Sequence, residues 1–266
     1  MIRAQTEKGW ILVNHRDHAL LASEFARVWG NELFDRPEPF GDVDFAVAHH
    51  DDGWIARDAN PTLTKDGKPE AFTRALVGAY SAFEEIDLPS YLRVRGNATA
   101  SVASQNPYAG ILVSMHTVNL LTEQADLSSI RPEHRPEFDR FIDQQRTWQK
   151  DMALRLRASQ ESLQRGFEFL QCCDNLSLIA CSAYESARDL RHQHPDRSGV
   201  KHTLRVSRAD VDVWGISPWP FARTRHDFSF PYREIHSSDC ASVETFRTAY
   251  GLAEVKPMHF SLVAGS

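Results

Sequence analysis

The residues best suited to chemistry lie together in the segment AVAHHDDGW, residues 46–54. An apolar stretch ends there in two imidazoles, His49 and His50, followed by two carboxylates, Asp51 and Asp52. Burying these groups without partners would be costly, and a bound cation would remove that cost, because imidazoles and carboxylates are both metal ligands. A solvated helix end with a capping aspartate is the alternative interpretation of this segment.

Two further polar residues stand among apolar neighbours and strengthen the metal interpretation. His18 lies in the first turn of an expected helix, directly before an apolar-periodic stretch. Asp174 lies in the middle of GFEFLQCCDNLSLIAC, which has the composition of a core helix. A buried aspartate is unfavourable unless it is paired or ligated. A salt bridge or a hydrogen bond to a tyrosine is the alternative for Asp174.

The order of these residues resembles the ligand pattern of the HD-domain superfamily of metal-dependent hydrolases. In that family a histidine on one helix, a His-Asp pair ending the next helix and an aspartate on a later helix hold a divalent metal. Gly53 also matches the usual His-Asp-x-Gly form. The resemblance implies metal binding by the set His18, His50, Asp51 and Asp174.

The same resemblance implies roles for residues near the ligands. The register of the motif favours His50 over His49 as the ligand, and Asp52 could orient the attacking water or a ligand histidine. His116, in GILVSMHTV, is either a core histidine or a catalytic residue that binds a second metal, steadies a phosphoryl group or acts as general acid. Trp54 stands where the family often has Lys or Arg, so no phosphate contact is inferred there.

The function implied by this resemblance is metal-dependent hydrolysis of a small phosphate ester. The cofactor would be one or two divalent ions of Fe, Mn, Co, Ni or Zn. One alternative is a di-iron oxygenase of the same superfamily, which needs two more histidines, and only His116 and His134 lie in the required interval. The other alternative is a non-catalytic protein that binds a metal or a small ligand. Lys65 and Lys68 could meet a phosphate, although lysines in polar loops are usually solvated.

Helical patterns dominate up to residue 192, and alternating patterns typical of strands follow. We therefore expect a mainly α fold, an HD-domain-like helical bundle over 1–192 with a small antiparallel β-sheet over 193–266 packed on it. Before residue 193 the patterns predict a strand at Trp10–Val13 and helices over 18–30, 42–53, 71–86, 88–103, 107–121 and from about 136, broken near Gly166. After it they predict strands over 203–207, 211–216, 226–235 and 258–263.

The motif PWPF, residues 218–221, lies outside the metal pattern. Together with AHHDDGW, PYAGILVSMH and DNLSL it makes the whole chain resemble a bacterial domain family of unknown function. Its prolines fit a turn or a sheet edge.

Composition limits the classes of protein. With 266 residues, 42% of them apolar, and a net charge of −6, the chain can bury a sizeable core but lacks the basic surface of a general nucleic-acid binder. The start lacks a secretory signal, and no apolar run is long enough to span a bilayer. We expect a cytoplasmic protein with a small-molecule substrate and no nucleic-acid or membrane partner. A homo-oligomer is compatible with the sequence.

Overall fold

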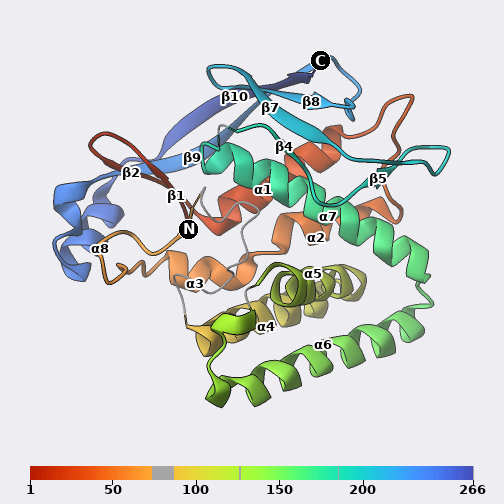
Figure 1. The fold of residues 1–266 in the computed structure, drawn as a ribbon, viewed down its shortest axis with the longest axis horizontal. Coiled ribbons are helices and arrows are strands. Elements are labelled where there is room, and N and C mark those ends of the chain that lie inside the picture. The colour runs from red at the N-terminus through yellow and green to blue at the C-terminus, as the bar shows by residue number, and fades with distance from the viewer. Residues whose placement is uncertain (74–86, 126, 185, 266) are drawn as a thin grey trace.

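The computed structural model describes residues 1–73, 87–125, 127–184 and 186–265 as a mixed α/β fold (Figure 1). In the view of Figure 1 the long strands lie along the top of the molecule and most of the helices lie below them. The α-helices are α1 (His15–Val28), α2 (Phe40–His49), α3 (Ile55–Asp58), α4 (Leu88–Gln105), α5 (Pro107–Asn119), α6 (Arg135–Leu156), α7 (Gln160–Cys181) and α8 (Val243–Leu252). Short helical turns are η1 (Asp52–Trp54), η3 (Leu120–Gln124), η4 (Leu127–Ser129), η5 (Pro132–His134) and η6 (Ser237–Cys240).

An eight-stranded sheet runs in the order β3-β1-β2-β9-β10-β8-β7-β4. Its strands are β1 (Ile2–Gln5), β2 (Gly9–Val13), β3 (Phe72–Thr73), β4 (Arg188–Asp189), β7 (Arg205–Asp210), β8 (Val213–Ser217), β9 (Arg225–His236) and β10 (Lys256–Ala264). A separate pair is formed by β5 (His194–Pro195) and β6 (Lys201–His202). The pairs β10–β8 and β1–β3 are parallel, whereas the other pairs are antiparallel.

The expected fold class, a mainly α bundle with a small C-terminal antiparallel sheet, is wrong. The sheet is large and mixed, and it takes in the first strands of the chain, because β2 pairs with β9 in antiparallel register. The alternating pattern marked the late strands correctly, but it carries no information about which distant strand pairs with which. The division of the chain at residue 192 into two domains stays a prediction, although this sheet draws strands from both sides of that point.

The helices between β2 and β4 largely follow the expected pattern, with two main differences. The long helical segment is broken at Arg157, which has a left-handed backbone (φ 54°), and α7 then starts after the capping side chain of Ser159. Gly166, the expected break, lies inside α7, where it allows close packing against Leu112 and Val43. Most of the helix expected over 71–86 lies outside the described residues, and its described beginning contains the strand β3.

The main core lies between α1, α2, α5, α7 and the sheet. Phe25 on α1 makes edge-to-face contacts with Phe228 of β9 and Phe260 of β10, which anchor that helix to the sheet. This anchoring fixes the helix that carries His18 relative to the rest of the molecule.

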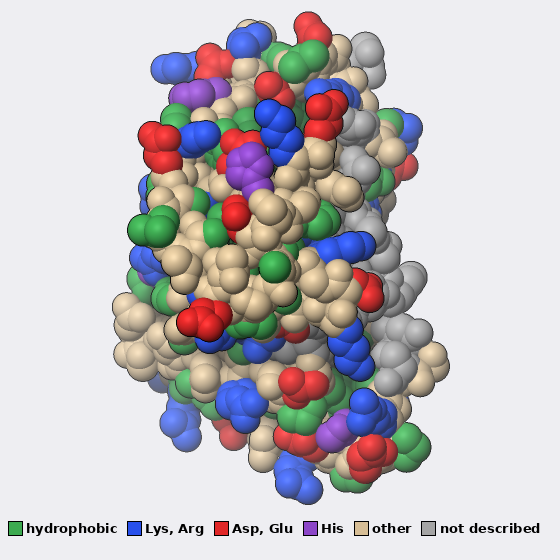
Figure 2. Space-filling view, turned by 90° about the vertical axis from the view of Figure 1, so that its left-hand side faces the viewer, with side chains coloured by type: hydrophobic (Ala, Val, Ile, Leu, Met, Phe, Trp, Pro, Cys, Tyr) green, Lys and Arg blue, Asp and Glu red, His purple; other side chains and the backbone are tan. Residues whose placement is uncertain are grey.

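The face turned toward the viewer in Figure 2 shows basic and acidic side chains interspersed, with hydrophobic side chains scattered between them. Among the helices that the structure describes, none has both the length and the apolar character required to cross a bilayer.

Candidate metal centre

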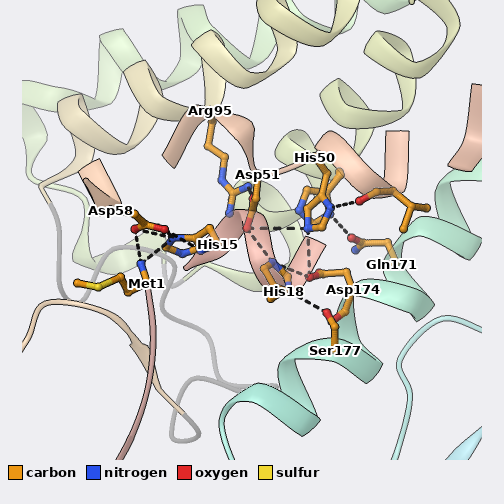
Figure 3. A network of polar contacts seen from close by, with 12 residues as sticks. Met1, His15, His18, His50, Asp51, Asp58, Arg95, Gln171, Asp174 and Ser177 are labelled. Atoms are coloured by element: carbon orange, nitrogen blue, oxygen red, sulfur yellow. Dashed lines mark hydrogen bonds and ion pairs between the residues drawn. The ribbon is translucent and has the colours of Figure 1, made fainter. Parts of the chain in front are cut away.

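Four of the residues selected from the sequence meet in the interior between α1, the end of α2 and α7 (Figure 3). Nε2 of His18 lies 3.0 Å from Oδ2 of Asp51 and 3.9 Å from Oδ1 of Asp174. Nε2 of His50 lies 3.4 Å from Oδ1 of Asp174 and 3.9 Å from Oδ2 of Asp51. None of the four residues is more than 5% exposed. Two imidazoles and two carboxylates from distant parts of the chain therefore share one buried space.

The end of α2 explains how neighbouring residues reach the same space. The helix ends at His49, and His50 still has helical dihedrals (φ −59°, ψ −23°). Asp51 leaves the helix with φ −112° and ψ 13°. This change of backbone direction lets both side chains turn inward, which a continuing helix would prevent, since adjacent residues on a helix point about 100° apart.

The contribution of α7 is a polar stripe on an apolar helix. Gln171, Asp174 and Ser177 follow one another at intervals of three, so they lie on one face of α7. All three are buried and all three contact histidines of the site.

The histidines are held by their Nδ1 atoms. Nδ1 of His50 lies 2.8 Å from the carbonyl oxygen of Val47, which can only accept, so Nδ1 carries the proton. Nδ1 of His18 lies 2.7 Å from Oγ of Ser177, which already donates its own hydrogen to the Asp174 carbonyl. Nε2 of His18, however, lies within hydrogen-bond distance of Oδ2 of Asp51, 3.0 Å away, and a carboxylate can only accept. In a neutral His50 ring the lone pair is therefore on Nε2, whereas His18 donates to Asp51 through Nε2 unless a metal ion replaces that hydrogen.

A lone pair facing a carboxylate is repulsive unless a cation lies between them. Nε2 of His50 is buried and has no hydrogen-bond partner among the described residues. Burial alone would lower the pKa of His50, but the charges of Asp51 and Asp174 outweigh it and raise the pKa to about 9. The two carboxylates thus favour a positive charge at Nε2 of His50, which either a proton or a metal ion could supply.

Arg95 on α4 supplies a second positive charge. Its guanidinium donates to Oδ1 of Asp51 and to the hydroxyl of Tyr91, and it lies over the ring of Trp54, 5.6 Å from the centroid. Burial would raise the pKa of Asp51, but Arg95 and then His50 hold it well below its usual range. Oδ1 of Asp51 is thus engaged by Arg95, while Oδ2 faces the histidines.

His116 on α5 lies beside this cluster, with its ring centroid 5.1 Å from that of His50. Its Nδ1 donates to Oε1 of Gln171, and Nε2 of Gln171 in turn donates to Oδ1 of Asn119, 2.8 Å away. Nε2 of Gln171 is also 3.2 Å from Nε2 of His192. Burial lowers the pKa of His116 to about 4, so this imidazole is neutral near pH 7 with its Nε2 lone pair available.

The donor atoms fit a divalent metal. Two sets of three donors can each be chosen within 4.8 Å of one another, one from His18, His50 and Asp174 and the other from His50, Asp51 and His116. With metal–ligand bonds of about 2.1 Å, neighbouring ligand atoms of a tetrahedral or octahedral ion lie about 3.0–3.4 Å apart. The separations of 3.0–3.9 Å between imidazole nitrogens and carboxylate oxygens are close to that range. The hydrogen-bonded Nδ1 atoms are the outer support that metal-binding histidines usually have.

Other residues selected from the sequence lie apart from these two sets. Asp52 pairs with Nδ1 of His49 at 2.7 Å and with Arg16 at 3.0 Å. His49 itself packs on the ring of Phe45, with centroids 4.3 Å apart. Three further candidates are also outside the two donor sets: Lys65 and Lys68, both exposed, and His134, at the end of η5.

The sequence reasoning missed the residues that support the ligands, namely Arg95, Gln171 and Ser177. It also missed a neighbouring buried group in which Oδ1 of Asp58 accepts from the Met1 amino group at 2.6 Å. Nδ1 of His15 lies 3.1 Å from the same oxygen, and its ring stacks on Trp54 at 4.4 Å. Gln171 and Ser177 lie three residues before and after Asp174, and this helical spacing could have indicated that they share its face of α7.

The comparisons with known proteins point to one family. Searches of the curated proteins and of the solved structures find no match. A family model described as "Protein of unknown function (DUF3891)" matches residues 1–237, most of the chain and all the residues of the metal centre. The chain therefore belongs to the DUF3891 family.

Proposed function

We propose that this protein is a metal-dependent hydrolase that acts on a phosphate ester. One observation carries the proposal. Three buried imidazoles, those of His18, His50 and His116, lie together with the carboxylates of Asp51 and Asp174, and in His50 and His116 Nδ1 donates to a fixed acceptor, which leaves Nε2 as the atom with the lone pair. Burying these imidazoles and carboxylates together is unfavourable, and a bound cation would offset that cost.

In this proposal His18, His50, Asp51 and Asp174 hold one divalent ion of Fe, Mn, Co, Ni or Zn. When bound, the ion supplies Lewis acidity and makes a water molecule acidic enough to act as a nucleophile near neutral pH. A second ion could use His50, Asp51 and His116. The order of the four ligands along the chain still resembles that of the HD-domain superfamily, and we place the protein near that superfamily only as part of this proposal.

The balance of charge favours an anionic substrate. Without metal, the two carboxylates are balanced by Arg95 and by protonated His50. A divalent ion would displace the proton from His50 and leave the site with a net charge of about +1. A buried excess of positive charge stabilises phosphoryl oxygens, on which negative charge accumulates during transfer.

The surrounding residues have defined tasks in this account. Arg95 keeps Asp51 ionised and fixes the direction of its second oxygen. Neutral His116 can accept a proton at Nε2, or bind a second ion there, while Gln171 keeps the ring in place. Asp52 is assigned no step, since its carboxylate is engaged by His49 and Arg16.

The test is hydrolysis of p-nitrophenyl phosphate and bis(p-nitrophenyl) phosphate by protein loaded separately with Mn, Fe, Co, Ni and Zn. We expect turnover that EDTA abolishes and that falls at least 100-fold in Asp174→Asn. Asp44→Asn is the matched control, because Asp44 on α2 binds Ser23 and Arg27 outside the cluster. Hydrolysis that is unchanged by EDTA or by Asp174→Asn would contradict the proposal.

The same preparation separates the alternatives. Two irons per chain together with substrate-dependent oxygen consumption would favour a di-iron oxygenase. Stoichiometric metal with no hydrolysis of either ester and no oxygen consumption would favour a structural or ligand-binding metal site.

A further inference from the structure

A second candidate site is a groove of 1290 Å³ beyond the C-terminal end of α1. Its walls are the end of α1, the following segment up to Arg36, and the turn that contains the PWPF motif. Its lining includes four arginines and two acids: Arg27, Arg36, Arg197, Arg223, Glu32 and Asp35. The metal ligands are absent from this lining.

The wall formed by the PWPF turn is firmly attached to the end of α1. Nδ2 of Asn31 donates to the carbonyl oxygen of Trp219 at 2.7 Å, and the backbone N–H of Gly30 donates to Pro220 at 2.9 Å. The indole of Trp219 donates to the carbonyl of Arg223 at 2.7 Å, which closes the turn. The groove is therefore built by several tertiary hydrogen bonds, and the motif that had no role in the metal centre forms one side of it.

The arginines of the groove are not all neutralised. Arg27 pairs with Asp44 at 2.9 Å, and Arg197 pairs with Asp35 at 2.8 Å. Arg36 and Arg223 are exposed and form no ion pair within the described parts of the chain, although Arg36 lies over the ring of Phe40, 4.5 Å from its centroid. The carbonyls at the end of α1 would disfavour an anion, but Arg27 in the last turn of that helix offsets them. The groove thus has two guanidinium groups whose charge no described carboxylate neutralises in an ion pair, and guanidinium groups match phosphate oxygens in geometry and charge.

The aromatic side of the groove presents two half-buried rings. Trp219 and His226 both line it and stack on each other, with ring centroids 6.4 Å apart and planes 29° apart. Trp29 and Phe221 also line the groove but are only 3% and 1% exposed. The rings of Trp219 and His226 therefore supply the flat surface that a ligand can reach.

We propose that this groove binds a small organic phosphate with a flat apolar part, separately from the metal centre. The phosphate would lie between Arg36 and Arg223, and the apolar part would lie against the rings of Trp219 and His226. The volume exceeds what inorganic phosphate fills and is ample for a molecule of nucleotide size.

Calorimetric titration in EDTA tests this with three probes: AMP, which has both parts; adenosine, which lacks the phosphate; and ribose 5-phosphate, which lacks the flat ring. We expect AMP to bind at least tenfold more tightly than either of the other two. In the double variant Arg36→Gln, Arg223→Gln, AMP should bind at least tenfold more weakly than in the wild type. The control Arg93→Gln, Arg146→Gln removes two exposed charges from α4 and α6 and should leave the affinity unchanged.

Asp174→Asn separates this proposal from the metal centre and should also leave AMP affinity unchanged. Equal weakening in both arginine double variants would show unspecific attraction and overturn the proposal. Loss of binding in Asp174→Asn would place AMP at the metal centre and also overturn it. Failure of AMP to bind the wild type at millimolar concentration would overturn the groove proposal as well, whatever the outcome of the hydrolysis assay.

Discussion

The histidines of the metal centre depend on atoms that would not touch the metal. Nδ1 of His50 and of His116 donates to a fixed acceptor, Val47 and Gln171 respectively, and Nδ1 of His18 lies 2.7 Å from Oγ of Ser177. These partners hold the ring planes in place, and in His50 and His116 they leave the lone pair on Nε2. The chemistry of the site is thus set by neutral residues as much as by the ligands.

Gln171 offers the clearest test of this support. In Gln171→Leu the Nδ1 proton of His116 loses its acceptor, so the ring can rotate or change tautomer. We expect kcat to fall about 10- to 100-fold with a changed pH–rate profile, and Gln171→Glu to recover part of the loss because a carboxylate also accepts. The measurement is the pH–rate profile of metal-loaded protein with p-nitrophenyl phosphate. Gln164→Leu, earlier on α7, is the control, and equal profiles for the two leucine variants would contradict this role.

Sequence reasoning found the ligands more easily than their support. His50 and Asp51 stood out because charged residues follow an apolar helix, and Asp174 stood out because a core helix contains a carboxylate. Arg95 did not stand out, because an arginine on a helix usually lies in solvent. Its burial depends on α4 meeting Asp51, a tertiary contact that local sequence patterns do not encode.

At the scale of elements, the site depends on how closely η1 approaches α4. A Cβ added to Gly53 would lie 2.2 Å from the carbonyl oxygen of Val94 and 3.0 Å from Cβ of Ala98. Gly53 directly follows the Asp51-Asp52 pair, and Val94 directly precedes Arg95. The glycine of the His-Asp-x-Gly motif therefore has a physical role here: it lets the backbone approach that brings Arg95 to Asp51.

Replacement of this glycine tests the contact. We expect Gly53→Ala to lower the free energy of unfolding by about 1–3 kcal/mol, because Cβ forces two backbones apart, and to weaken metal binding as Arg95 moves. Gly41→Ala is the matched control, since no described atom outside its chain neighbours and the backbone of its own helix lies within 4 Å of the added Cβ, and alanine favours the helix. Urea unfolding and metal titration of both variants provide the measurement. A loss of stability in Gly53→Ala no greater than in Gly41→Ala would refute the argument.

The periodic patterns predicted most of the helices that surround the metal centre, but they did not predict how the strands pair in the sheet. Strong 3.6-residue periodicity located α1, α4, α5 and α7, because burial of one helix face is a local property of sequence. The break at Arg157 was missed because arginine is not a residue type that indicates the end of a helix. Glycine often is, so Gly166 was chosen as the break although it lies inside α7. The parallel pairing of β10 with β8 depends on contacts between separate strands and could not be inferred from either strand alone.

At the scale of the whole molecule, buried neutral histidines make stability depend on pH. His194 is 4% exposed, and its ring packs beside Trp29 with Nε2 3.2 Å from the carbonyl oxygen of Glu168. Burial lowers the pKa of His194 to about 4, against about 6.5 in an unfolded chain. Between these values the unfolded chain binds more protons, so the stability from this residue is complete above about pH 6.5 and is lost as the pH falls toward 4.

Substitution of His194 should reduce that dependence. In His194→Gln we expect the decrease in unfolding free energy between pH 6.5 and pH 4 to be smaller than in the wild type, by up to about 3 kcal/mol. Urea unfolding at a series of pH values measures this decrease. Because other titrating groups such as His50 are present in both proteins, their contributions cancel when the variant is compared with the wild type. His259→Gln, at an exposed position on β10, should keep the pH dependence of the wild type. Parallel curves for His194→Gln and the wild type would rule out this effect.

The central claim is that the buried cluster binds a divalent metal, and metal content tests it most directly. Elemental analysis should be made on protein purified without added metal and on protein incubated with Mn, Fe or Zn and then desalted. We predict at least one ion per chain in the wild type and in Asp44→Asn, and near-complete loss in His50→Ala and Asp174→Asn, with circular dichroism confirming that the variants fold. A wild-type protein that holds no metal after these incubations, or holds as much as folded Asp174→Asn, would contradict the account.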